Sequence, residues 1–267
     1  MPSDPFSLFD DWDRYPLRNA MAQIPDNDLQ VPRICVVIHL YYTDLWRDFD
    51  LALQSMKWPF DLVITLNQED GDLCASISKS YPGTIFHVRP NLGRDVAPFL
   101  WLLGQGAFDG YDLVCKMHAK KSAKQGAETL VGRLWRRRAI LDLIGSSERV
   151  EKIIGAFEAD PSIGMAGSTA LHLPTPANHD PSGIPSLNNR KQIAKQCGFE
   201  RCNNPAQFYA GTMFWVRPQV LEPVRHLGLE KSMSLGTGSG DTSEMEYAME
   251  RFFGDLVTAQ GYQFLDA

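Results

Sequence analysis

The feature of this chain that most constrains its fold is the repeated alternation of short apolar runs with longer segments of helical periodicity. Residues 34–40 (ICVVIHL) form a nearly continuous apolar run, which is typical of a strand buried on both faces. Further strands are expected at 60–66, 84–88, 111–117 and 208–216. Helices are expected at 45–56, 72–80, 130–144, 149–159 and 243–260, with another beginning after Gly93. This order predicts an α/β fold with a doubly wound, mostly parallel central sheet flanked by helices.

The chain is expected to contain one large domain preceded by an arm. Residues 1–32 contain Pro, Asp and aromatic residues without clear periodicity, so we interpret them as an N-terminal accessory arm. The strand and helix pattern begins at Arg33, and residues 33–267 are therefore predicted to form the main domain. A stretch rich in Pro, Asn and His, residues 174–189, is expected to be a long loop.

Charge and cysteine content narrow the class of protein. The formal net charge of −6 argues against nucleic acid binding, which requires an excess of Lys and Arg. No apolar run approaches the roughly 20 residues of a transmembrane helix, and the N-terminus has no secretory signal. These features predict a cytoplasmic protein with reduced thiols, attached to the inner face of the membrane at most peripherally. The five cysteines lack the spacing of a zinc site: Cys35, Cys74, Cys115, Cys197 and Cys202.

Two segments follow the carboxyl ends of predicted strands, where open α/β sheets bind ligands. The first, NLGRDVAPFL (91–100), opens a helix with Asp95 as the expected N-cap, and Arg94 offers a planar fork for phosphate oxygens. An ordinary turn with a surface Arg is the alternative. The second segment is YDLVCKMHAKKS (111–122), in which the period of two aims Lys116 and His118 at one face. A buried Lys requires an anion, so this segment predicts an anion site, and a solvated basic loop is the alternative.

Two later segments complete the candidate site. In the expected strand 208–216, the small residues Gly211 and Thr212 are expected to line a ligand, while the aromatic residues around them belong to the core. The last helix begins within GDTSEMEYAMER (240–251), where Ser243 and Glu246 fit a capping box. Asp241 and Glu244 have no such structural explanation, so they are the candidates for a general base.

At these segments the sequence resembles the rhamnan synthesis protein F family of bacterial polysaccharide biosynthesis. The resemblance rests on NLGRDVAPFL, YDLVCKMHAKKS and AGTMFW (210–215), with a weaker match at Glu250-Arg251. It implies a GT-A-like glycosyltransferase that transfers rhamnose, a deoxyhexose, from dTDP-rhamnose or a similar nucleotide sugar to a glycan or lipid-linked acceptor. No cofactor beyond that substrate is implied, and polysaccharide assembly proteins are candidate partners. The family usually has a His three residues before the Glu-Arg pair, where this chain has Tyr247.

The resemblance also suggests a mechanism. Metal-dependent GT-A enzymes hold a divalent cation with Asp-x-Asp at the end of a central strand, where this chain has Lys-Met-His. Because cationic side chains repel a metal ion, we hypothesise a metal-independent enzyme. Its leaving nucleoside diphosphate would be neutralised by Arg94, Lys116, His118 and Lys120.

The remaining roles concern the acceptor and the nucleotide. Asp241, ahead of Glu244, is expected to deprotonate the acceptor hydroxyl in an inverting reaction. Tyr41 and Tyr42 are placed to stack on the nucleotide base, and packing at the rim of the site is the alternative. Asn67 is placed to hydrogen-bond the base. The nucleotide or sugar site is further expected to include Asn91, Asp95, Gly211 and Thr212.

Two other classes of protein were compared with this interpretation. A catalytically inactive sugar-nucleotide-binding or scaffold subunit of a polysaccharide assembly complex stays open, and the Tyr247 substitution is its best support. An NAD-dependent dehydrogenase would share the alternating pattern, but no Gly-x-Gly-x-x-Gly follows the first strand, where HLYY (39–42) stands instead.

Overall fold

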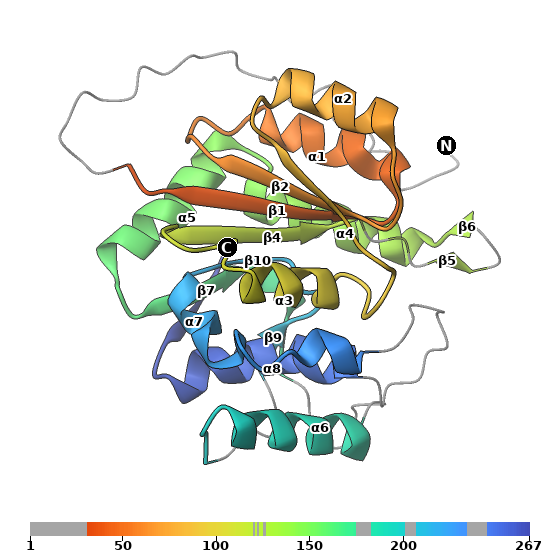
Figure 1. Ribbon diagram of the computed structural model, residues 1–267. Coiled ribbons are helices and arrows are strands. Elements are labelled where there is room, and N and C mark those ends of the chain that lie inside the picture. The colour runs from red at the N-terminus through yellow and green to blue at the C-terminus, as the bar shows by residue number, and fades with distance from the viewer. Residues whose placement is uncertain are drawn as a thin grey trace, which may run out of the picture.

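The computed structural model describes residues 31–119, 121, 123–124, 127–174, 183–200, 207–233 and 245–267. Its centre is a seven-stranded sheet with the order β11-β7-β10-β4-β1-β2-β3 (Figure 1). Neighbouring strands are parallel except β10, which is antiparallel to both β4 and β7. The strands are β1 (Ile34–Leu40), β2 (Asp61–Leu66), β3 (Ile85–Val88), β4 (Leu113–His118), β7 (Ile163–Gly167), β10 (Phe214–Val216) and β11 (Gln263–Asp266).

Helices cover both faces of this sheet, with a separate hydrophobic core under each layer. One face carries α1 (Trp46–Leu53), α2 (Gly71–Ser80), α4 (Leu130–Ile144) and α5 (Ser147–Ala159). The other carries α3 (Val96–Gly104), α7 (Pro218–Leu221) and α8 (Met245–Ala259), and α6 (Gly183–Gln196) packs on the outer side of α8. The predicted α/β class, with a mostly parallel sheet between helical layers, is therefore confirmed.

Shorter elements connect these layers. Two small antiparallel sheets pair β5 (Ala123–Lys124) with β6 (Ala127–Glu128) and β8 (His172–Pro174) with β9 (Gln207–Tyr209). The 3-10 helices are η3 (Thr43–Leu45), η4 (Thr169–Leu171), η5 (Glu222–Val224) and η6 (Leu229–Ser232). Among the described helices, none combines the length and apolarity needed to cross a lipid bilayer.

Local sequence explains where several helices begin. The side chains of Asp70, Thr129 and Ser146 each accept a hydrogen bond from a backbone N–H in the first turn of α2, α4 and α5, respectively. Such N-caps satisfy backbone donors that have no partner within the helix. The three helices begin within two residues of the predicted positions.

Two sequence-based predictions about the second half of the chain are wrong. The expected strand 208–216 is two short strands, β9 and β10, in different sheets, because Gly211 (φ 87°) and Thr212 (φ 53°) turn the backbone between them. The expected loop 174–189 contains α6 from Gly183 onward. That helix buries polar side chains, with Ser186 1% and Arg190 4% exposed, so it lacks the apolar stripe by which helices are recognised. Strands β7 and β11 were not predicted.

The predicted N-terminal arm, residues 1–32, lies outside the described residues except for its last two positions. Its boundary with the main domain therefore stays a prediction.

Candidate functional site

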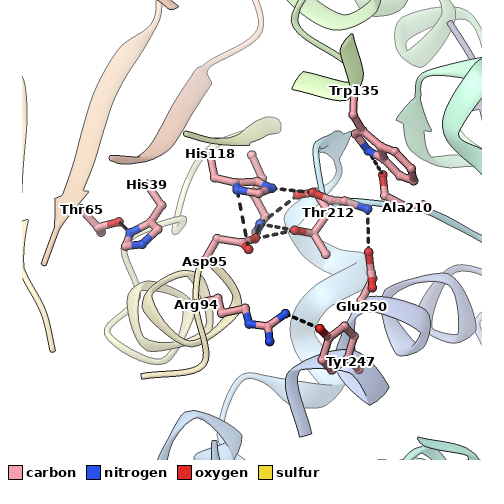
Figure 2. Close-up of polar contacts among 12 residues, drawn as sticks. His39, Thr65, Arg94, Asp95, His118, Trp135, Ala210, Thr212, Tyr247 and Glu250 are labelled. Atoms are coloured by element: carbon pink, nitrogen blue, oxygen red, sulfur yellow. Dashed lines mark hydrogen bonds and ion pairs between the residues drawn. The ribbon is translucent and has the colours of Figure 1, made fainter. Parts of the chain in front are cut away.

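The candidate site lies where β1, β2 and β4 end. These three strands are parallel neighbours, so their carboxyl ends meet at one edge of the sheet. The glycine turn before α3 lies at the same edge, and the turn at residues 210–213 joins it because antiparallel β10 begins there, with Phe214 opposite Lys116. The close-up shows how side chains from these segments converge (Figure 2).

Asp95 occupies the predicted N-cap position of α3, but its carboxylate does not cap the helix. Instead, Asp95 Oδ2 lies 2.5 Å from Lys116 Nζ on β4 and accepts a hydrogen bond from the Thr212 hydroxyl. The side chains of Asp95 and Lys116 are 12% and 2% exposed, so this is a largely buried ion pair. In the chain, Lys116 is 21 residues and Thr212 is 117 residues from Asp95, so these contacts join three separate segments.

Lys116 is buried, as predicted, and its anion is supplied by the protein. The ammonium also donates to the Thr212 carbonyl oxygen at 2.9 Å and to Thr212 Oγ1 at 3.0 Å. It lies 5.4 Å from the ring centroid of Phe99 and 5.8 Å from that of Phe214. An ammonium has three N–H donors, and Lys116 has three partners. A direct contact with a donor diphosphate would require it to release one of them.

His118 lies beside this ion pair. Its Nε2 donates to the Gly211 carbonyl oxygen at 2.6 Å, and its Nδ1 is 3.7 Å from Asp95 Oδ1. Burial by itself raises the pKa of Asp95, but the charges of His118 and Lys116 and hydrogen bonds from Lys116 and Thr212 hold that pKa well below its ordinary value. Burial lowers the pKa of Lys116, and the Asp95 carboxylate opposes that shift. The cluster is thus an ion pair that fixes the turn at residues 211–212.

Arg94 points to α8. Its backbone is left-handed (φ 56°), as is that of Gly93 (φ 55°). Arg94 Nη1 donates to the Tyr247 hydroxyl at 2.6 Å, and the guanidinium carbon lies 4.5 Å from the centroid of the Tyr247 ring. A Cβ on Gly93 would lie 2.5 Å from Met233 Sδ, so this tight turn requires glycine.

The second turn is also held by neighbouring elements. Glu250 Oε1 on α8 accepts from the Gly211 N–H at 2.6 Å, and Trp135 Nε1 on α4 donates to the Ala210 carbonyl oxygen at 3.2 Å. A Cβ on Gly211 would lie 2.7 Å from Trp135 Nε1, which together with its φ of 87° explains the glycine.

A row of polar residues crosses the sheet next to the ion pair. Thr65 on β2, His39 on β1 and His118 on β4 are aligned in register. His39 Nδ1 pairs with Thr65 Oγ1 at 2.8 Å, whereas the described residues provide no hydrogen-bond partner for the buried Nε2. Burial lowers the pKa of His39 from 6.5 to about 4; the Asp95 charge opposes this shift and the Lys116 charge adds to it.

The predicted nucleotide-binding residues lie at the same sheet edge. Tyr41 and Tyr42 follow β1 as an edge-to-face pair with ring centroids 4.8 Å apart, and Tyr41 is 37% exposed. Lys121 Nζ lies 5.0 Å from the centroid of the Tyr42 ring and forms an ion pair with Asp44. Asn67 follows β2, and Asn91 belongs to the turn before α3.

The structure thus brings six of the predicted site residues together: Arg94, Asp95, Lys116, His118, Gly211 and Thr212. Lys120, Asp241 and Glu244 lie outside the described residues, so their roles stay predictions. No group of three or more His, Cys, Asp or Glu side chains suited to a metal ion occurs in the part of the chain that is described.

Tyr247 and Glu250 were singled out by the family resemblance alone and without a role at this site, and Trp135 and His39 were not predicted to belong to it. Tyr247 and Glu250 are three residues apart and therefore share a face of α8, which was a usable signal. The elements that this face would contact were not predictable from helical periodicity.

Comparisons with known proteins agree with the sequence resemblance. Residues 13–262 match the family described as rhamnan synthesis protein F. The protein WxcX from two strains of Xanthomonas campestris pv. campestris is 26% identical over 249 residues, covering 92% of this chain and 34% of WxcX. The chain therefore spans about a third of the length of these relatives.

Two solved structures show weaker overall similarity. A cytidylyltransferase from Leptospira borgpetersenii is 11% identical with a TM-score of 0.40, covering 88% of this chain and 74% of the other. Glucosyl-3-phosphoglycerate synthase from Mycobacterium tuberculosis is 12% identical with a TM-score of 0.35, covering 71% and 58%.

Proposed function

Because the chain belongs to the rhamnan synthesis protein F family, we propose that it is a glycosyltransferase of polysaccharide synthesis with a GT-A-like fold. Its donor is a nucleoside-diphosphate deoxyhexose, and dTDP-rhamnose is the first candidate because of the family's description. Its acceptor is a polysaccharide or a lipid-linked glycan.

The observation that carries this proposal is the ion pair of Asp95 and Lys116 at the carboxyl edge of the sheet. A buried ion pair adds little net stability to a fold, because the cost of removing two charges from water offsets their attraction. Here the pair fixes the turn at Thr212 beside the turn that bears Arg94. This edge of an open α/β sheet is also where such folds bind ligands.

On the donor side, Arg94 binds the diphosphate, since its planar guanidinium matches phosphate oxygens. His118 and Lys120 add positive charge, and Lys116 acts mainly by fixing Asp95 and Thr212. Tyr41 and Tyr42 stack on the base, and Asn67 hydrogen-bonds it. The sugar lies against Asn91 and the turn at Gly211 and Thr212.

The transfer step is an inverting displacement. Asp241, ahead of Glu244, takes the proton of the acceptor hydroxyl, and that oxygen forms a bond to the anomeric carbon as the bond to the diphosphate oxygen breaks. The nucleoside diphosphate leaves with the bonding electron pair, and the fixed positive groups stabilise the charge that develops on it.

We propose further that this step needs no divalent cation. Asp95 is the carboxylate that contacts Lys116 and His118 on β4, and it is already neutralised by Lys116. A carboxylate engaged in this way is a poor ligand for Mg²⁺ or Mn²⁺ unless the ion pair opens. Loss of turnover in EDTA with recovery on addition of either cation would refute this part of the proposal.

The proposal is tested by incubating the protein with dTDP-rhamnose and rhamnose-containing glycan acceptors and measuring release of dTDP. We expect release that depends on the acceptor and is abolished by Asp241→Asn, which should leave donor affinity unchanged. If the wild type bound the donor but showed no turnover, the protein would instead be a sugar-nucleotide-binding subunit. Absence of binding to dTDP-, UDP- and GDP-sugars would refute the donor site itself.

A further inference from the structure

Both turns of the candidate site have strained backbones. Among the described residues, the non-glycine residues with positive φ are Arg94 (φ 56°) and Thr212 (φ 53°). A left-handed conformation costs a residue with a side chain about 1 kcal/mol or more, so surrounding contacts must maintain it. The two positions lie in different segments, yet both adjoin the Asp95 carboxylate, since Arg94 precedes it in the chain and Thr212 donates to it.

One face of α8 contacts both turns. Tyr247 accepts a hydrogen bond from Arg94 Nη1 and stacks against its guanidinium. Glu250, one helical turn further on, accepts from the N–H of Gly211, directly before Thr212. Figure 2 shows these two contacts side by side.

From these contacts we infer that Tyr247 and Glu250 are positioning residues: α8 uses Tyr247 to aim Arg94 at the donor diphosphate and Glu250 to fix the turn at Gly211 and Thr212. The inference rests on the proposed function and names how its donor site is held in shape.

Glu250 suits positioning better than proton transfer. One carboxylate oxygen accepts the Gly211 N–H, and the other lies 3.7 Å from Arg251 Nη1. Both carboxylate oxygens are therefore already engaged by groups of the protein, which suits holding the turn better than receiving a proton from an acceptor hydroxyl. Arg251 is itself fixed by the Tyr247 carbonyl oxygen at 3.0 Å, so Tyr247, Glu250 and Arg251 act as one group on α8.

The test for Tyr247 is a double-mutant cycle on the dissociation constant of dTDP, measured by calorimetry with Tyr247→Phe, Arg94→Ala and the double variant. Phe keeps the ring and removes only the hydroxyl, and Ala at position 94 keeps the left-handed backbone under similar strain. We expect Tyr247→Phe to weaken dTDP binding about five- to tenfold in the wild-type background, as for the loss of one ordinary hydrogen bond. In the Arg94→Ala background the same change should have less than about a twofold effect.

Tyr111→Phe is the matched control. The Tyr111 hydroxyl donates to Asp61 Oδ2 at 2.7 Å at the opposite end of the sheet, so this variant also loses one tyrosine hydrogen bond. The inference would be overturned if Tyr247→Phe lowered dTDP affinity equally in the wild-type and Arg94→Ala backgrounds. It would also be overturned if Tyr111→Phe lowered dTDP affinity as much as Tyr247→Phe. Unchanged affinity of Tyr247→Phe would overturn it and leave the proposed function intact. If the wild type bound none of dTDP, UDP and GDP, both would fail.

The test for Glu250 compares Glu250→Gln with Glu250→Ala. The amide oxygen of Gln still accepts the Gly211 N–H, so we expect Gln to retain dTDP affinity within about twofold and Ala to lose about tenfold. Turnover should follow the same order. If Glu250→Gln bound dTDP normally but lost as much turnover as Glu250→Ala, Glu250 would be assigned to proton transfer. That result would refute the positioning role. The Gln variant keeps the test informative if the Ala variant does not fold.

Discussion

His39 makes the stability of this fold depend on pH in a range that extends above the ordinary pKa values of carboxylates. His39 is 6% exposed, and burial lowers the pKa of its imidazole from 6.5 to about 4. A lowered histidine pKa means that the unfolded chain binds a proton more readily than the folded one. The stabilisation from neutral His39 is therefore fully present above pH 6.5 and is lost as the pH falls towards 4.

The size of the effect follows from the same two pKa values. Each tenfold change in proton affinity corresponds to about 1.4 kcal/mol, so the complete loss is about 3 kcal/mol. At pH 5 the unfolded histidine is mostly protonated and the folded one mostly neutral, which gives a loss of about 2 kcal/mol relative to pH 8. Such a loss is a large part of the stability of an ordinary domain.

The assay is urea unfolding of the wild type and of His39→Asn at pH 8 and pH 5. Asn retains a polar atom near the position of Nδ1, which pairs with Thr65, and it does not titrate. The difference in free energy of unfolding between the two pH values should be about 2 kcal/mol smaller in the variant than in the wild type. The exposed His226, changed to Asn, serves as the control and should leave the wild-type difference unchanged. Identical pH dependence in wild type and His39→Asn would show that the folded protein does not hold His39 neutral at pH 5.

Two further predictions concern the packing of α8. Arg190 and Asp255 form a buried two-bond ion pair between α6 and α8, at 2.8 and 2.9 Å. Asp255→Asn should lower the free energy of unfolding by about 3–5 kcal/mol, because it removes the negative charge opposite a buried guanidinium. A loss below about 1 kcal/mol, measured by urea unfolding, would contradict this. Gly254 lies so close to β9 that a Cβ would be 1.7 Å from the Gln207 carbonyl oxygen. Gly254→Ala should therefore lower the melting temperature, despite the better helix propensity of Ala. A raised melting temperature would show that α8 can move away from β9.

The parts of the fold that followed from sequence are those where a single segment carries its own signal. Strand β1 is apolar apart from His39, and α4 shows helical periodicity, so both were predicted to within a residue. Helix α6 was missed because its buried face carries Arg190, whose partner Asp255 is 65 residues away. No local pattern reveals that such an arginine is buried.

In the candidate site, too, features with a local sequence signal were predicted and those that depend on distant contacts were not. Its location followed from strand ends and a glycine turn, and Arg94 was identified there. The ion pair of Asp95 with Lys116 was not predictable, because helix-start patterns suggest a cap and Thr212 contacts Asp95 from 117 residues away. The left-handed backbone at Thr212 was equally hidden, since residues 208–216 have the composition of one continuous strand.

In the proposed function, the turn bearing Arg94 binds the diphosphate of a nucleotide sugar at this sheet edge. Its most direct test is a crystal structure of the protein with dTDP, grown in EDTA. We predict a diphosphate oxygen within hydrogen-bonding distance of the Arg94 guanidinium and the thymine base against Tyr41 or Tyr42. A nucleotide bound elsewhere, or one that binds only through a metal ion held by carboxylates, would contradict the account.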